Sequence, residues 1–425
     1  METAVIPISG FPFKRFLLAA NPKLAASRSF ATAPVLICAL LLVSASPLCA
    51  QQPISLDEAA LRGQTIYQQS GGTGMVLVVV RNHEVMVKGY GETAPGSGRA
   101  PDSASEIRLC SLSKVLAADL LNKLSAEGKV ALTDPLQRYA PRGKLVPEGP
   151  GNTQITLFDL ATHTSGLPRE VSAYPRKTPH FTFPSHAVRW DWLPKQELKA
   201  PPGTAALYSN VGFDLLGDAL ATGSHMPYAK LLHDRILQPL DMWDTTLFPT
   251  VDQCARLLQG SGDDGPCTST EASGASGGVY STPADMVKLL EYLLHVPGSP
   301  AQAPAAQNVY LKPAALKSVQ GLSHAGDPTG IGLAWVQIGD PDSPSALLEK
   351  TGGGAGFTTY IALSTSHQTG IFAAVTDGKG KSEIDFFHEC NTLVAALANV
   401  PQLPPKVRPI PAPKRRAKHR RRPQI

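Results

Sequence analysis

Three short motifs in this chain carry residue types that could catalyse acyl transfer. The first is an S-x-x-K element, in which Ser111 and Lys114 stand at the start of an apolar run with helical spacing. Residues three apart on a helix are neighbours, so the Lys114 amine can lie beside the Ser111 hydroxyl. Burial disfavours the charged form of a lysine, and a neutral amine can take the proton from a serine nucleophile. Alone the element is a weak signal, because a helix cap followed by a surface lysine has the same pattern.

The second motif is Y-x-N, formed by Tyr208 and Asn210 between a Pro-Pro-Gly turn and a helical stretch. A phenol at this place could pass on a proton, and a side-chain amide could hydrogen-bond a substrate amide. A helix cap beneath a packed tyrosine would also fit these residues.

The third motif is K-T-G, formed by Lys350, Thr351 and Gly352 and followed by Gly353, before a strand-like run. Glycines let a substrate approach the backbone closely, and a strand edge can bind an extended peptide through main-chain hydrogen bonds. Lys350 and Thr351 would suit a carboxylate. The alternative is a glycine-rich turn that only enters a strand.

The order S-x-x-K, Y-x-N and K-T-G resembles the serine β-lactamase/DD-peptidase family of penicillin-binding proteins. The Y-x-N form is similar to the branch of class C β-lactamases and low-molecular-weight DD-peptidases. The stretches "ITLFDLATHTSGLP", "SGGVYSTPADMVKLL" and "GIGLAWV" also resemble that branch, and the resemblance runs from about Ile54 to Val400. Cys110, Glu349 and a basic C-terminal tail depart from it, and none of them replaces a catalytic residue.

The resemblance implies a serine D-alanyl-D-alanine carboxypeptidase/endopeptidase that cleaves peptidoglycan stem peptides through an acyl-enzyme and reacts with β-lactams. It implies that Ser111 forms the acyl-enzyme and that Lys114 takes its proton. Tyr208 would relay this proton to the leaving amine and later activate water, while Asn210 would hold the substrate amide.

The K-T-G element would form the substrate-binding side of the same site. Lys350 and Thr351 would engage the terminal carboxylate, with Gly352 and Gly353 beside them. The backbone N–H groups of Ser111 and Gly353 would form the oxyanion hole, in which one donor can contribute about 3 kcal/mol.

Other functions remain open from the sequence. A class C-like β-lactamase or esterase would use the same residues, and a non-catalytic envelope-binding protein could keep the fold. Ser276 lies in a G-x-S-x-G pattern and His163 could serve as a triad base, but the polar residues before Ser276 predict a loop where that motif needs a strand. No H-E-x-x-H or paired C-x-x-C motif occurs, so we expect no metal and no cofactor.

The pattern of elements predicts an α+β fold of the β-lactamase/transpeptidase type. Strand-like hairpins at 74–92 and 360–375 and a helix at 383–400 come from the two ends of the domain, and the middle is rich in helical periods. We therefore expect an antiparallel sheet flanked by helices, from about 51–110 and 330–403, with a mostly helical part inserted at about 111–330. A cleft between the two parts would hold the site.

Residues 1–50 resemble an export signal, with four Lys/Arg residues before the short apolar run "APVLICALLLV" and small residues up to Ala50. The signal predicts an exported, periplasmic protein. In an oxidising compartment Cys254 and Cys267, which flank a Gly/Asp-rich loop, could form a disulfide, although two unpaired cysteines fit the pattern too.

The charge is distributed unevenly along the chain. Of the net charge of +5, residues 404–425 contribute nine Lys/Arg without an acid and the first 50 residues contribute +3, which leaves 51–403 at −7. An acidic domain with a basic, Pro-rich tail does not suggest a nucleic-acid enzyme. We expect the tail to be disordered, and peripheral association with an anionic envelope surface is a further hypothesis. The oligomeric state cannot be read from the sequence.

Overall fold

The computed structural model describes residues 52–172, 178–179, 181–262, 264–301, 306–380 and 382–404, which belong to one structural unit. The predicted signal peptide and nearly all of the basic tail lie outside the described residues.

The central element is an eight-stranded sheet in which all neighbouring strands are antiparallel, in the order β2-β1-β12-β11-β10-β9-β8-β6. Its strands are β1 (Gly74–Arg81), β2 (Glu84–Gly91), β6 (Val309–Leu311), β8 (Pro328–Gly332), β9 (Val336–Ile338), β10 (Leu347–Gly354), β11 (Phe357–Ser364) and β12 (Thr369–Thr376). Two small sheets pair β3 (Ile107–Arg108) with β5 (Tyr280–Ser281) and β4 (Ala206–Leu207) with β7 (Val319–Gln320).

Several helices begin at side chains that cap free backbone N–H groups, among them Ser55, Ser209, Thr282 and Asp385. The α-helices are α1 (Leu56–Ser70), α2 (Ser113–Ala126), α3 (Leu157–Ala161), α4 (His186–Trp192), α5 (Asn210–Ser224), α6 (Tyr228–Leu232), α7 (Val251–Arg256), α8 (Pro283–Leu293) and α9 (Phe386–Ala398).

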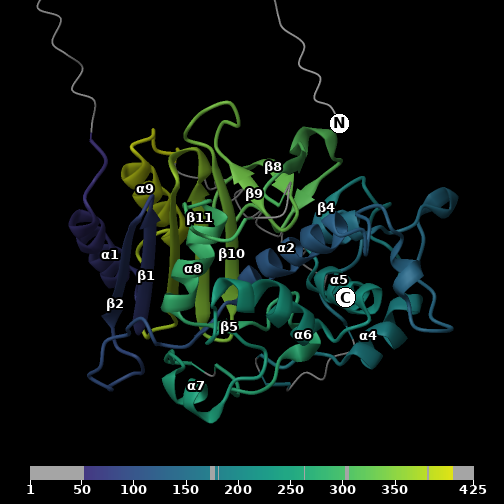
Figure 1. Ribbon diagram of the computed structural model, residues 1–425, viewed down its shortest axis with the longest axis horizontal. Coiled ribbons are helices and arrows are strands. Elements are labelled where there is room, and N and C mark those ends of the chain that lie inside the picture. Colours follow the sequence, from purple (N-terminus) through teal and green to yellow (C-terminus); the bar gives the residue numbers. More distant parts are fainter. Residues whose placement is uncertain are drawn as a thin grey trace, which may run out of the picture. The chain divides into compact units, whose positions relative to one another are not determined.

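Both faces of the sheet are buried, because β1 and β12 are almost continuous apolar runs. Val76 and Val78 of β1 belong to the hydrophobic cluster that includes α2, α5 and α8. Leu77 and Val79 point to the opposite face, into the cluster with α1 and α9. Figure 1 shows α1 and α9, which come from opposite ends of the domain, lying side by side against the sheet.

The predicted α+β fold, with an antiparallel sheet built from both ends and helices on its faces, is confirmed. Three local expectations need adjustment. The K-T-G residues lie within β10 instead of leading into the strand, Ser111 lies in a short 3-10 helix (Cys110–Leu112) that precedes α2, and β6 and the start of β8 come before residue 330. We propose that the sheet part of the domain begins near residue 309 on its C-terminal side.

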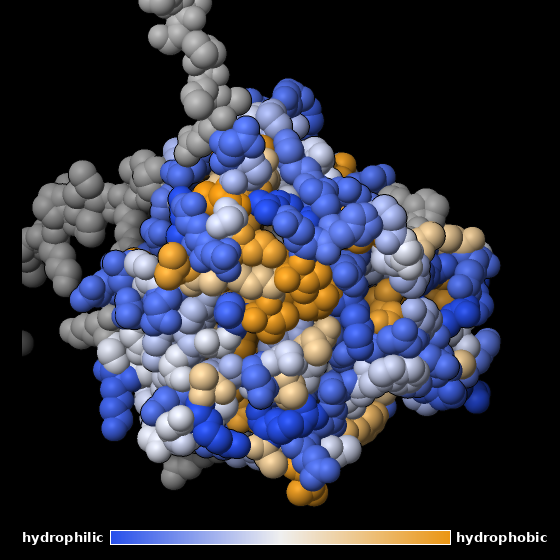
Figure 2. Space-filling model, turned by 60° about the vertical axis from the view of Figure 1, so that its left-hand side comes forward, coloured by the Kyte–Doolittle hydropathy of each residue, from blue (hydrophilic) through white to orange (hydrophobic). Residues whose placement is uncertain are grey.

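A disulfide joins Cys254 in α7 to Cys267, one of the two possibilities that the sequence left open, while Cys110 and Cys390 are buried thiols. The side that carries α1 and β2 is mainly hydrophilic, and its largest hydrophobic cluster lies near the centre of the view (Figure 2). Within the described part of the chain, no helix combines the length and apolar character that crossing a bilayer requires.

Candidate active site

Ser111 is held where β3 turns into α2, directly beside β10. The Ser113 hydroxyl donates to the Cys110 carbonyl at 2.7 Å, and Cys110 has a positive φ of 52°, which tightens this turn. Strand β10 passes so close that a Cβ at Gly352 would lie 2.9 Å from the Leu109 carbonyl oxygen. A glycine at 352 therefore lets the K-T-G strand approach the segment that carries Ser111.

The Ser111 hydroxyl contacts two of the predicted catalytic groups at once. The Tyr208 phenol donates to Ser111 Oγ at 2.6 Å, and Lys114 Nζ lies 3.3 Å from the same oxygen. Both distances lie within or near the reach that proton transfer requires. The arrangement can therefore deliver a proton to, or remove one from, a single hydroxyl by two routes.

The Lys114 amine is enclosed by acceptors although the side chain is fully buried. It donates to Asn210 Oδ1 at 2.6 Å and to the backbone carbonyl of Ser276. Burial lowers the pKa of Lys114 to about 7, and the carboxylates of Asp214 and Glu170 oppose this shift. A lysine with such a pKa is a competent general base near neutral pH.

Tyr208 sits between β4 and α5 with cations on its ring. Lys114 Nζ and Lys350 Nζ each lie 4.9 Å from the ring centroid, and the Arg169 guanidinium carbon lies 4.7 Å from it. The Tyr208 ring therefore lies among three basic side chains, close to both Lys114 and Lys350.

His163 holds the backbone on both sides of Tyr208. Its carbonyl accepts from the Leu207 N–H at 2.8 Å, and its Nδ1 accepts from the Ser209 N–H at 3.1 Å. Its ring packs against the Tyr208 ring at a centroid distance of 4.5 Å. Burial and the nearby Lys350, Lys114 and Arg169 lower the pKa of His163 well below 6.5, so the ring stays neutral and keeps Nδ1 as an acceptor. These contacts indicate that His163 positions the backbone around Tyr208 and does not act as the base of a triad.

The K-T-G strand supplies the wall opposite Tyr208. Lys350 is buried on the face of β10 that points to α2 and α5, and burial lowers its pKa. Glu349 is buried on the other face, and burial raises its pKa. Thr351, Gly352 and Gly353 line a pocket together with Ser111.

Two pockets meet at Ser111. The first, of about 220 Å³, extends between α5, the Phe181–Phe183 segment and the turn after β10, and Asn210, Glu170 and Asp214 are among its lining residues. The second, of about 230 Å³, lies along β10 and is lined by Tyr208, Thr351 and His324. Ser111, Arg169 and Gly353 border both pockets. A chain lying across Ser111 would thus place one part in each pocket.

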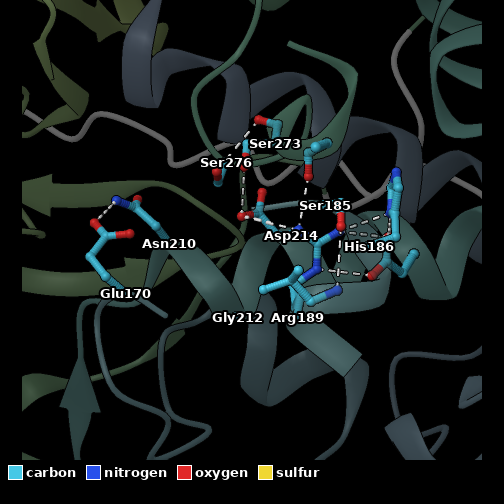
Figure 3. A network of polar contacts seen from close by, with 12 residues as sticks. Glu170, Ser185, His186, Arg189, Asn210, Gly212, Asp214, Ser273 and Ser276 are labelled. Carbon is cyan, nitrogen blue, oxygen red and sulfur yellow. Dashed lines mark hydrogen bonds and ion pairs between the residues drawn. The ribbon is translucent and has the colours of Figure 1, made fainter. Parts of the chain in front are cut away.

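All eight predicted site residues gather around this junction, and their roles stay predictions. One detail differs from expectation: both ends of the Asn210 amide are engaged, because its Nδ2 also donates to Glu170 Oε1 at 2.5 Å (Figure 3). Holding a substrate amide would require Asn210 to exchange one of these partners.

Sequence reasoning missed Glu170 and Asp214 as pocket residues. The position of Asp214 could have been found from a weak sequence signal, because it follows Asn210 by one helical turn and so lies on the same face of the helix.

Ser276 is not a nucleophile elbow, because a 3-10 turn and not a strand precedes it. Residues 171–194 carry five aromatic side chains. Phe181 and Phe183 line the first pocket, Trp190 and Trp192 are buried, and Tyr174 lies outside the described residues.

Comparison with known proteins identifies the class to which this fold and site belong. Residues 63–389 match the family model described as Beta-lactamase, so the chain belongs to the beta-lactamase family.

Among individual relatives, the chain is similar to the D-alanyl-D-alanine-carboxypeptidase/endopeptidase AmpH of Escherichia coli. The two are 41% identical over 334 residues, which cover 77% of this chain and 86% of the relative. A human protein, putative beta-lactamase-like 1, is 34% identical over 268 residues, covering 58% of this chain and 52% of that protein.

Solved structures show the same architecture. A beta-lactamase/D-alanine carboxypeptidase from Yersinia pestis, in complex with citrate, superposes with a TM-score of 0.76 at 39% identity and covers 81% of this chain and 99% of that one. A class C beta-lactamase mutant superposes with a TM-score of 0.64 at 20% identity, over 80% of this chain and 96% of that one, a likeness of fold alone.

Proposed function

We propose that this protein is a serine D-alanyl-D-alanine carboxypeptidase/endopeptidase that acts on peptidoglycan stem peptides and is acylated by β-lactams. The observation that carries the proposal is the Ser111 hydroxyl, contacted by both Tyr208 and Lys114 at the meeting point of two pockets. The relatives named as D-alanyl-D-alanine carboxypeptidases support the choice of substrate.

Acylation begins with the neutral Lys114 amine. It removes the Ser111 proton as Oγ attacks the carbonyl carbon of the penultimate D-alanine. Backbone N–H groups of Ser111 and Gly353 stabilise the negative charge on the carbonyl oxygen. Tyr208 passes a proton to the leaving amine, and the C–N bond breaks as the acyl-enzyme forms.

Deacylation runs the same proton path in reverse. Tyr208 takes a proton from water, which attacks the ester carbonyl, and Ser111 recovers its proton as the ester bond breaks. The pocket along β10 suits the leaving residue, since the buried Lys350 and the partly exposed Arg169 near Tyr208 both favour a carboxylate.

We further propose that the protein works in the periplasm after removal of residues 1–50. The Cys254–Cys267 disulfide supports an oxidising compartment. Peripheral attachment to the envelope through the basic tail remains part of this proposal.

The function is tested with a purified pentapeptide ending in D-alanyl-D-alanine and with a cross-linked dimer. Release of D-alanine and cleavage of the dimer by the wild type, but not by Ser111→Ala, is the expected result. Fast, repeated hydrolysis of a β-lactam with both peptides left intact would instead establish a class C-like β-lactamase.

A further inference from the structure

The amine of Lys114, the proposed base, is oriented by a backbone carbonyl from a distant part of the chain. Lys114 Nζ donates to the Ser276 carbonyl and to Asn210 Oδ1, and it lies 3.3 Å from Ser111 Oγ. A neutral amine has two N–H groups and one lone pair. With one N–H group on each of the two acceptors, the lone pair is left for the hydroxyl of Ser111. The place of the Ser276 carbonyl therefore decides whether the base faces the nucleophile.

The segment that carries this carbonyl is a tight turn closed on Ser273. The Ser273 carbonyl accepts from the N–H groups of Ser276, Gly277 and Gly278, at 3.1, 3.0 and 2.9 Å. The turn follows a short 3-10 helix (Glu271–Ser273) and leads into β5. Because three consecutive N–H groups bind one oxygen, the Ser276 carbonyl moves with Ser273.

Two buried charged side chains hold this turn against α4 and α5. The Ser273 hydroxyl donates to Asp214 Oδ2 at 3.0 Å, and Arg189 Nη1 donates to the Ala272 carbonyl at 2.8 Å. A hydrogen bond of the Ser276 side chain also acts on Asp214. Figure 3 shows the two serines on one side of Asp214 and Arg189 on the other, where Arg189 Nη1 lies 3.6 Å from Asp214 Oδ2. Asp214 therefore links α5 directly to the turn that orients the amine.

Asp214 also acts on Lys114 as a charge. Burial raises the pKa of Asp214, and Arg189, the hydrogen bonds from the two serines and Lys114 oppose this shift. Burial lowers the pKa of Lys114 to about 7, and Asp214 is the strongest of the charges that oppose it. The other titratable groups that face this pair come from several elements and are Arg169, Glu170, Cys110, Arg189, Tyr228 and Lys350. Loss of the charge at 214 alone should therefore lower the pKa of Lys114 further.

We propose that Asp214 is a positioning residue for the Lys114 amine. Its hydrogen bonds to the two serines hold the Ser276 carbonyl in the place that leaves the lone pair of the amine for Ser111. The proposal deepens the proposed function and rests on it, because it requires Lys114 to be the base. Asp214 acts through the turn and takes no part in bond making or breaking.

The test is the rate of acylation by a chromogenic ester, followed by stopped flow from pH 5 to 9. Asp214→Asn keeps the shape of the side chain and loses its charge. We expect the rising limb of its pH profile to move to lower pH by about one unit. Ser273→Ala keeps the charge and loses the hydrogen bond. We expect its plateau rate to fall about tenfold, with the limb at the wild-type pH, because the base is then less well aligned.

A double-mutant cycle shows whether the two residues act as one unit. Ser273→Ala should cost about tenfold in the wild type but little in Asp214→Ala, because the hydroxyl then has no carboxylate to hold it. Asp119→Asn is the matched control. It removes another buried carboxylate, which lies on α2 outside both pockets, and it should keep the wild-type plateau and limb.

A wild-type plateau in Ser273→Ala together with an unmoved limb in Asp214→Asn would overturn the positioning role and leave the proposed function standing. Losses that simply add in the double variant would overturn it too. If Asp214→Ala does not fold, Asp214→Asn and Ser273→Ala decide. A flat profile in a wild type that is acylated at Ser111 would remove both Lys114 as the base and the role of Asp214. Failure to release D-alanine from peptides would reject the peptidase activity alone.

Discussion

The Tyr208 hydroxyl lies 2.6 Å from Ser111 Oγ, nearer than the Lys114 amine at 3.3 Å. Two groups that can exchange a proton with Ser111 therefore contact one nucleophile, and they also contact each other, because Lys114 Nζ lies 4.9 Å from the centroid of the Tyr208 ring. In the proposed mechanism the pair divides the work: Lys114 begins acylation, and Tyr208 serves the leaving group and the attacking water.

Replacing Tyr208 by phenylalanine should remove the relay and keep the ring. We expect kcat for peptide hydrolysis to fall about 10²- to 10⁴-fold, the usual contribution of a general acid–base group. Deacylation should slow as well, so that a penicilloyl-enzyme persists longer than in the wild type. Tyr67→Phe, which loses a hydrogen bond to the Thr73 carbonyl at a distance from both pockets, is the control and should leave kcat unchanged.

The depressed pKa of Lys114 predicts a pH profile. Because the neutral amine is the active form and the pKa is about 7, the acylation rate should rise about tenfold per pH unit below 7 and level off above it. Stopped-flow measurement of acylation by a chromogenic ester from pH 5 to 9 gives the curve. Lys114→Arg keeps the charge but stays protonated throughout, and it should be inactive at every pH. A flat profile in the wild type would exclude Lys114 as the base.

His163 offers a test of positioning that is separate from proton transfer. His163→Leu leaves the Ser209 N–H without its acceptor, and His163→Asn offers an oxygen near the place of Nδ1. We expect the leucine variant to lose about tenfold or more in kcat with little change in KM, and the asparagine variant to recover part of that loss. Equal kcat in the two variants would mean that the hydrogen bond to Ser209 does not position Tyr208.

The sequence predicted the sheet and the contact between Ser111 and Lys114 because each depends on local patterns. The apolar runs of β1 and β12 need burial on both faces, and the S-x-x-K spacing places Ser111 beside Lys114. The other proposed catalytic residues were found through the family resemblance, and their roles stay predictions. The partners of Asn210 were not predictable, because Glu170 reaches it from a loop 40 residues away. Asp214 was missed for a similar reason, since only the folded chain brings Ser273 and Arg189 to it.

The buried carboxyl group of Glu106 leads us to expect that the free energy of unfolding decreases at alkaline pH. It is fully buried, neither carboxylate oxygen has a hydrogen-bond partner, and burial raises its pKa from 4.5 to about 8. The folded state thus binds more protons than the unfolded state between these two values, and the contribution of Glu106 to stability falls as the pH rises through this range. Glu106→Gln should stabilise the protein at pH 9 by about 2 kcal/mol and change little at pH 5.

Urea unfolding at the two pH values measures the effect of Glu106→Gln. The exposed Glu84, paired with Arg81 at the surface, supplies the control: Glu84→Gln should change stability little at either pH. If Glu106→Gln instead changed the free energy of unfolding by the same amount at pH 9 and pH 5, the pKa of Glu106 would not be raised by burial.

The central claim is that the Ser111 hydroxyl is the nucleophile, and intact-protein mass spectrometry after treatment with benzylpenicillin tests it most directly. The wild type should gain the mass of one penicillin molecule, and Ser111→Ala should gain none. Recovery of the same adduct on Ser111→Ala would contradict the account, because the covalent bond would then form at another residue.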